Sequence, residues 1–243
     1  MASYPPAMPR RPGLIGIGFA LIGLALAWSV MLLFGGTEMD RGFLMLLYAG
    51  ERPEIATYAR WVTEFGGWRV LLPATVLGIV ILLVRRRFRA AIVLFLLTAS
   101  GRALVELQKM QTARIRPEEH EHLVEVQSLS FPSGHAADSA IVWLALAFLL
   151  IDRYPARAFA VWAAAWLSLA VGISRLVLGV HWPTDVIGGW AFGIFWTLLL
   201  LTLAGFPLDD GTPSQLRHSS PEGDAHEQRE QPWSGARPDG EAP

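Results

Sequence analysis

The segment from Ser174 to Asp185, S-R-L-V-L-G-V-H-W-P-T-D, carries an arginine, a histidine and an aspartate between two long apolar runs. Asp185 stands four residues after His181, at the expected start of a helix, so its carboxylate can accept a hydrogen bond from one imidazole nitrogen. That bond would fix the tautomer and leave the other nitrogen free to attack. With Arg175 as a fixed cation, the combination suits phosphoryl chemistry.

Two earlier stretches complete a candidate site. Lys109 and Arg116 flank six residues where the third apolar run ends, so we expect both cations at a helix end. Snorkelling and capping of the helix carboxyl terminus are the alternative. Further on, a Pro-Ser-Gly turn precedes His135 and another apolar run, and such a helix start can bind an anion. Ser133 as an ordinary helix cap is the simpler alternative.

A metal site is a second interpretation of the same residues. His135, His181 and Asp185 could form a site of two histidines and one carboxylate. However, the three cations of these stretches would repel a divalent ion and are the natural complement of an anion. We therefore expect neither a metal nor another cofactor.

Composition sets the environment of these residues. The 243 residues are 53% hydrophobic, with ten Trp and a mean hydropathy of +0.39, which is too apolar for an ordinary soluble domain. The net charge is −1, so nothing indicates a nucleic-acid partner. The absence of cysteine excludes disulfides and thiolate chemistry.

Apolar runs predict an all-α, polytopic membrane bundle of about six transmembrane helices. The expected spans are 13–34, 68–84, 90–108, 136–151, 157–173 and 186–204. They form one membrane domain, 13–206, with its motif core at 109–185. Residues 1–12 are expected to be a short cytoplasmic amino terminus and residues 207–243 a disordered cytoplasmic tail. The first span resembles a signal peptide at residues 25–27 but continues to Phe34, which favours an uncleaved anchor.

Charge distribution predicts the orientation. The densest positive cluster, Arg85–Arg89, should be cytoplasmic by the positive-inside rule. Counting spans from there puts the 109–135 and 174–185 connections together on the external side. We therefore expect a multi-pass protein of the cell (inner) membrane whose active site faces the periplasm or exterior. Residues 35–67 mix charges with short apolar pieces and suggest an amphipathic or interfacial excursion.

The three stretches share the pattern of a known family. K-x6-R-P, P-S-G-H and S-R-x5-H-x3-D occur in order, with no departure at any motif position. Over roughly residues 68–204 the chain resembles the type 2 phosphatidic acid phosphatase superfamily, which also includes vanadium haloperoxidases and glucose-6-phosphatase.

The resemblance implies a role for each motif residue. His181 would be the nucleophile that becomes phosphohistidine, oriented by Asp185, and His135 the general acid and then the base that activates water. The remaining motif residues would bind the phosphoryl oxygens: Lys109, Arg116, Arg175, Ser133 and the backbone N–H of Gly134.

The expected activity is metal-independent hydrolysis of a membrane lipid phosphate or diphosphate. Undecaprenyl diphosphate, phosphatidic acid, phosphatidylglycerophosphate and lipid A phosphates all fit as substrates. A lipid phosphotransferase that uses the same phosphohistidine is the closest alternative. A non-enzymatic channel or scaffold, or a haloperoxidase, would explain fewer of these features, and the number of subunits stays open.

Overall fold

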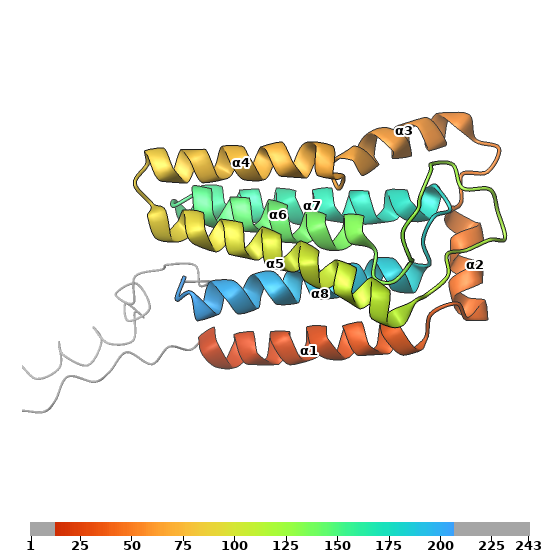
Figure 1. Ribbon diagram of the computed structural model, residues 1–243, viewed down its shortest axis with the longest axis horizontal. Coiled ribbons are helices and arrows are strands. Elements are labelled where there is room, and N and C mark those ends of the chain that lie inside the picture. Colours follow the sequence, from red (N-terminus) through yellow and green to blue (C-terminus); the bar gives the residue numbers. More distant parts are fainter. Residues whose placement is uncertain (1–12, 207–243) are drawn as a thin grey trace, which may run out of the picture. The chain divides into compact units, whose positions relative to one another are not determined.

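The computed structural model describes residues 13–206, and every regular element within this range is a helix (Figure 1). The elements, in chain order, are α1 (Gly13–Leu33), α2 (Glu38–Leu47), α3 (Pro53–Glu64), α4 (Trp68–Val84), α5 (Phe88–Thr112), α6 (Gly134–Leu150), α7 (Tyr154–Val177) and α8 (Pro183–Leu203). The all-α prediction is confirmed. The predicted amino-terminal segment 1–12 and tail 207–243 lie outside the described residues.

The long helices have the dimensions of membrane spans. Five helical stretches are long and apolar enough to cross a bilayer: α1, the stretch Pro53–Val84 that contains α3 and α4, α5, α7 and α8. The shorter apolar helix α6 has 17 residues, or roughly 26 Å. Large apolar side chains on the outer faces, such as Phe19 (72% exposed) and Trp162 (68% exposed), suit contact with lipid. About six membrane helices were predicted, and this arrangement confirms them.

Several helices extend beyond the predicted spans at the end that carries the motifs. The helix predicted for 157–173 continues to Val177, and the one predicted from 186 begins at Pro183. The excursion at 35–67 consists of α2 and α3. Figure 1 shows α2 across one end of the bundle and α3 leading into α4. Both helices contact α7.

The helix α6 is the centre of the bundle, because it contacts α4, α5, α7 and α8. Its approach to α8 depends on two glycines four residues apart. A Cβ on Gly189 would lie 2.7 Å from the carbonyl oxygen of Ser133, and one on Gly193 would lie 2.6 Å from that of Ala137. Small residues at such positions let helix backbones approach closely within a membrane. The starts of α6 and α8 are thereby held side by side.

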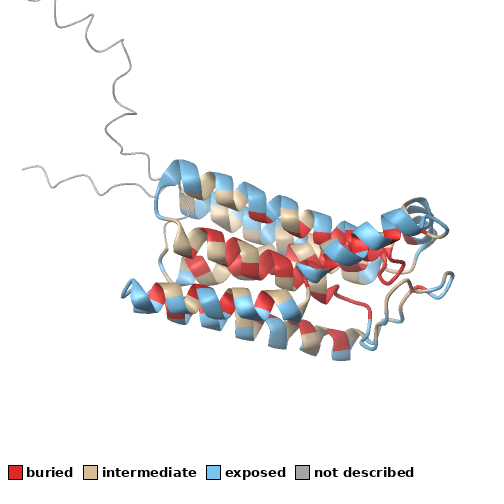
Figure 2. Ribbon diagram, turned by 90° about the horizontal axis from the view of Figure 1, so that it is seen from above, coloured by how far each residue is buried: buried red, intermediate tan, exposed pale blue. Residues whose placement is uncertain are grey.

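The loop that leads into α6 is also buried. Residues 130–133 are all buried, although most of the preceding loop is exposed or intermediate. Figure 2 shows exposed residues on the outer helix faces and buried residues where helices face one another. Because α6 is short, this loop descends into the bundle before the helix begins. The motif at 132–135 therefore lies among the other helices.

Candidate active site

The three motifs meet at one end of the bundle, around a cavity of about 740 Å³. They come from the end of α5, the 113–133 loop with the start of α6, and the end of α7 with the start of α8. The motif residues that line the cavity are Lys109, Arg116, Gly134, His135, Arg175 and His181. The two remaining predicted residues, Ser133 and Asp185, are fully buried beside this group.

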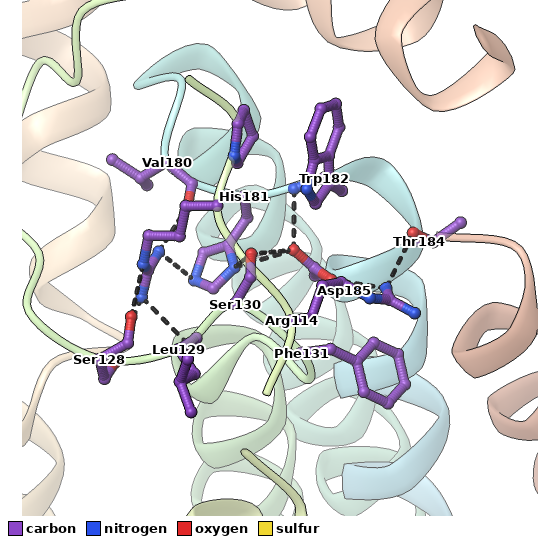
Figure 3. Close-up of polar contacts among 12 residues, drawn as sticks. Arg114, Ser128, Leu129, Ser130, Phe131, Val180, His181, Trp182, Thr184 and Asp185 are labelled. Atoms are coloured by element: carbon purple, nitrogen blue, oxygen red, sulfur yellow. Dashed lines mark hydrogen bonds and ion pairs between the residues drawn. The ribbon is translucent and has the colours of Figure 1, made fainter. Parts of the chain in front are cut away.

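The carboxylate of Asp185 lies beside the Nδ1 edge of the His181 imidazole and accepts from several donors (Figure 3). Its Oδ2 lies 3.4 Å from Nδ1 of His181 and accepts from the backbone N–H of Trp182 at 2.9 Å. The hydroxyl of Ser130 donates to the same oxygen, and Arg114 donates to Oδ1 at 2.8 Å. Asp185 therefore caps the start of α8. Its carboxylate binds the Trp182 N–H at the helix start.

The neighbours of His181 define its tautomer. Nη1 of Arg116 lies 3.1 Å from Nε2 of the imidazole, and a guanidinium can only donate. Nε2 must therefore accept, and the ring proton resides on Nδ1, facing Asp185. Burial, together with the positive charges of Arg116, Arg175 and Lys109, holds the pKa of His181 well below its usual value. The ring is consequently neutral at physiological pH, and its Nε2 lone pair accepts from Arg116 at the lining of the cavity.

Two cations are held by the 113–133 loop. The ammonium of Lys109 donates to the hydroxyl of Ser128 at 2.9 Å, and Arg116 Nε donates to the Ser128 carbonyl at 2.7 Å. Arg116 also donates to the carbonyl of Val180. Burial lowers the pKa of Arg116 to about 10, so it stays charged.

Lys109 lies in the last turn of α5, as predicted, but the position of Arg116 differs from the prediction. Because α5 ends at Thr112, Arg116 lies in the loop and not at a helix end. Lys109 is only 5% exposed, so it does not snorkel to the surface.

The third cation and the α6 start retain unused hydrogen-bonding atoms. Arg175, 3% exposed, donates through Nη1 to Thr63 at 2.8 Å, but its buried Nε has no hydrogen-bond partner. Ser133 is the N-cap residue of α6, yet its side chain makes no capping bond and its buried Oγ is also unpartnered. Unpaired buried polar atoms are costly, and an anion in the cavity would satisfy them.

The cavity continues between α4 and α5 as an apolar channel. Its lining there is mainly hydrophobic: Leu71, Leu72, Val76, Ile79, Phe95 and Ala99. At the junction with the polar end, Arg102 forms ion pairs with Glu106 at 2.7 Å and Asp138 at 2.8 Å. The cavity therefore joins a cationic end to a channel that suits a hydrocarbon chain.

The sequence did not reveal the residues that support the motifs. Arg114, Ser128, Ser130 and Asp40 all bond to motif residues or to the first turn of α8. Arg114 stands between Lys109 and Arg116 in the sequence. Its charge in that segment could have identified it as a further residue of the site. The serines and Asp40 lie in ordinary polar segments, where only the fold shows their contacts.

The donor set does not favour a metal. Within residues 13–206, no group of three His, Asp or Glu side chains is arranged to hold a metal ion. The carboxylate of Asp185 is already surrounded by N–H and O–H donors.

The sequence is similar to those of known phosphatases. The model of the PAP2 superfamily matches residues 89–206. Phosphatidylglycerophosphatase B of Bacillus subtilis is 32% identical over 149 residues, covering 60% of this chain and 71% of that protein. Lipid A 1-phosphatase of Rhizobium johnstonii is 29% identical over 208 residues, covering 82% of this chain and 69% of that protein.

A solved structure agrees with the fold. The crystal structure of a transmembrane PAP2-type phosphatidylglycerolphosphate phosphatase from Bacillus subtilis superimposes with a TM-score of 0.70 at 26% identity. The match covers 76% of this chain and 96% of that one. The chain therefore belongs to the PAP2 superfamily, as a membrane-spanning phosphatase.

Proposed function

We propose that the protein hydrolyses a lipid phosphate or diphosphate through a phosphohistidine on His181, without a metal. The observation that carries this proposal is the environment of His181. Its neutral imidazole has Nδ1 toward Asp185 and Nε2 toward a cavity that three cations surround. A nucleophile oriented by a carboxylate and placed among cations suits attack on a phosphoryl group.

In the first step, Arg116 shifts its hydrogen bond from Nε2 of His181 to a phosphoryl oxygen. The freed Nε2 attacks phosphorus, so a P–N bond forms while the bond from phosphorus to the lipid oxygen breaks. The Nδ1 proton stays hydrogen-bonded to Asp185, which stabilises the positive charge that develops on the ring. His135 gives its proton to the departing oxygen. A bound phosphate favours the protonated imidazole of His135 by its negative charge.

In the second step, water attacks the phosphohistidine and His135 takes the proton from that water. The P–N bond breaks, and orthophosphate leaves the site. Throughout both steps the charge on the phosphoryl oxygens is stabilised by Lys109, Arg116 and Arg175. The unpartnered Oγ of Ser133 and the N–H of Gly134 at the start of α6 are the uncharged donors.

The channel between α4 and α5 supports a lipid as the substrate. Its apolar lining gives the hydrocarbon chain a place beside the spans, while the phosphoryl head reaches the cations. The relatives compared above are named for phosphatidylglycerophosphate and lipid A. We therefore infer a membrane lipid phosphate of the same general kind.

We also infer that the active site faces the external side of the cell membrane. The Arg85–Arg89 cluster lies at the turn between α4 and α5, at the opposite end of these helices from Lys109. The positive-inside rule assigns that end to the cytoplasm.

Hydrolysis should depend on His181 and persist without metals. Purified protein in detergent with EDTA should release phosphate from phosphatidylglycerophosphate, phosphatidic acid or undecaprenyl diphosphate. His181→Ala should lower the rate at least ~1,000-fold, because the nucleophile is lost. The matched control is His120→Ala, in the 113–133 loop, which should retain wild-type activity because His120 does not line the cavity. Full activity in His181→Ala, or complete loss in EDTA, would refute the mechanism.

Filling the apolar channel should weaken binding of lipids selectively. Ala99→Trp should raise KM for a long-chain phosphatidate about tenfold, because the indole occupies the hydrocarbon path. The same variant should leave hydrolysis of a dihexanoyl phosphatidate nearly unchanged. Ala165→Trp, on an exposed face of α7, is the control. Equal effects of Ala99→Trp on both chain lengths would argue against a tail in this channel.

The orientation can be tested directly because the natural chain has no cysteine. A membrane-impermeant maleimide added to intact cells should label Glu121→Cys, in the 113–133 loop. It should label Arg153→Cys, in the turn before α7, only after the membrane is permeabilised. The reverse pattern would show that the active site opens to the cytoplasm.

A further inference from the structure

Arg114 lies in the 113–133 loop, close to the motif cations, but it does not line the cavity. Its side chain is 14% exposed and lies against Asp185 and Phe131 (Figure 3). Nη1 donates to Asp185 Oδ1 at 2.8 Å and to the Thr184 hydroxyl at 3.3 Å. The guanidinium centre lies 4.3 Å from the centre of the Phe131 ring. Arg114 therefore approaches Asp185 from the side opposite His181.

The other half of the guanidinium binds the end of α1. Nη2 of Arg114 donates to the carbonyl oxygens of Met31 at 3.0 Å and Leu32 at 2.6 Å. These carbonyls belong to the last turn of α1, where backbone acceptors lack helical partners and the helix dipole favours a cation. A Cβ at Gly35 would lie only 2.1 Å from Cζ of Arg114, so the chain that leaves α1 passes directly over the guanidinium.

A second set of hydrogen bonds holds the first turn of α8. Asp40 of α2 is 3% exposed and accepts from the Thr184 backbone N–H at 3.0 Å and from the Thr184 hydroxyl at 2.6 Å. Asp40 also accepts from the N–H of Gly36. Residues 31–40 are thus joined to the first turn of α8 through both Arg114 and Asp40.

We propose that Arg114 is a positioning residue for the reaction, which connects the carboxyl end of α1 to Asp185 and thereby orients His181. This inference rests on the proposed function of His181 as the nucleophile. Arg114 does not touch the substrate. Its planar guanidinium binds Asp185 and the end of α1 at the same time, which a lysine cannot do. Its positive charge also acts on Asp185, and a lysine would keep that charge.

The charge of Arg114 should influence the protonation of His181. Its positive charge offsets part of the negative charge of Asp185. Without it, Asp185 favours the imidazolium more strongly, so the pKa of His181 rises. A smaller fraction of His181 is then neutral at a given pH, and the acid limb of the pH–rate profile moves to higher pH. The other charged or titratable groups around His181 stay in place: Lys109, Arg116, Arg175 and His135.

The test compares Arg114→Gln and Arg114→Lys with wild type. Arg114→Gln should lower kcat ~100-fold, keep KM within about threefold and move the acid limb upward by about one pH unit. Arg114→Lys should lower kcat ~10-fold and leave the acid limb in place, because the charge is kept. The matched control is Arg87→Gln, which breaks the Arg87–Asp152 pair at the far end of α5 and should retain wild-type kinetics.

The outcomes separate this inference from the proposed function. An inactive wild type would refute the proposed function, whereas an active wild type with unchanged Arg114→Gln kinetics would overturn only the positioning role. Equal losses in both variants with an unmoved acid limb would also overturn it, because that pattern indicates general structural damage. The pKa of His181, followed by NMR of labelled histidine and assigned with His181→Ala, should rise in Arg114→Gln independently of turnover.

Discussion

The buried carboxylate of Asp185 is the interaction on which the rest of the active site depends. A charge removed from water is destabilising by several kcal/mol unless donors surround it. Here those donors come from separate parts of the chain: Arg114 and Ser130 from the 113–133 loop, and Trp182 from the start of α8. Through Arg114 the end of α1 joins the same network. The carboxylate can therefore be stable only when the helices are assembled, so folding of the bundle also orients His181.

The cations pose the opposite problem, because they must remain together before any anion binds. The 113–133 loop meets part of this requirement with oxygen acceptors, chiefly the hydroxyl and carbonyl of Ser128. The buried Nε of Arg175 and Oγ of Ser133 still have no hydrogen-bond partner. A site that is incompletely satisfied without substrate is complementary to a phosphoryl group. On the proposed function, the apolar channel beside it explains why such a site lies among membrane helices, because the head and the tail of a lipid require adjoining surroundings of opposite polarity.

The sequence was sufficient for the fold class, the approximate spans and the meeting of the three motifs, because apolar run length and motif spacing are local signals. It failed where the outcome depends on long-range contacts. Arg116 was expected at a helix end, but α5 ends earlier, at Thr112, and the arginine reaches His181 from the loop. Asp40 bonds to Thr184, 144 residues further along the chain, and no local pattern marks that pairing. The close approach of α6 and α8 through Gly189 and Gly193 likewise appears only once both helices are placed.

The most direct test of this account is to isolate the covalent intermediate. A His135→Ala variant would lack the base for the second step, but an aryl phosphate labelled with ³²P has a leaving group that needs no acid. Rapid quenching should therefore trap stoichiometric label on the His135→Ala chain, stable in alkali and released by acid, as expected of a P–N bond. The double variant His135→Ala/His181→Ala should carry none. Label that persists without His181, or an active wild type whose His135→Ala variant never becomes labelled, would contradict nucleophilic attack by His181.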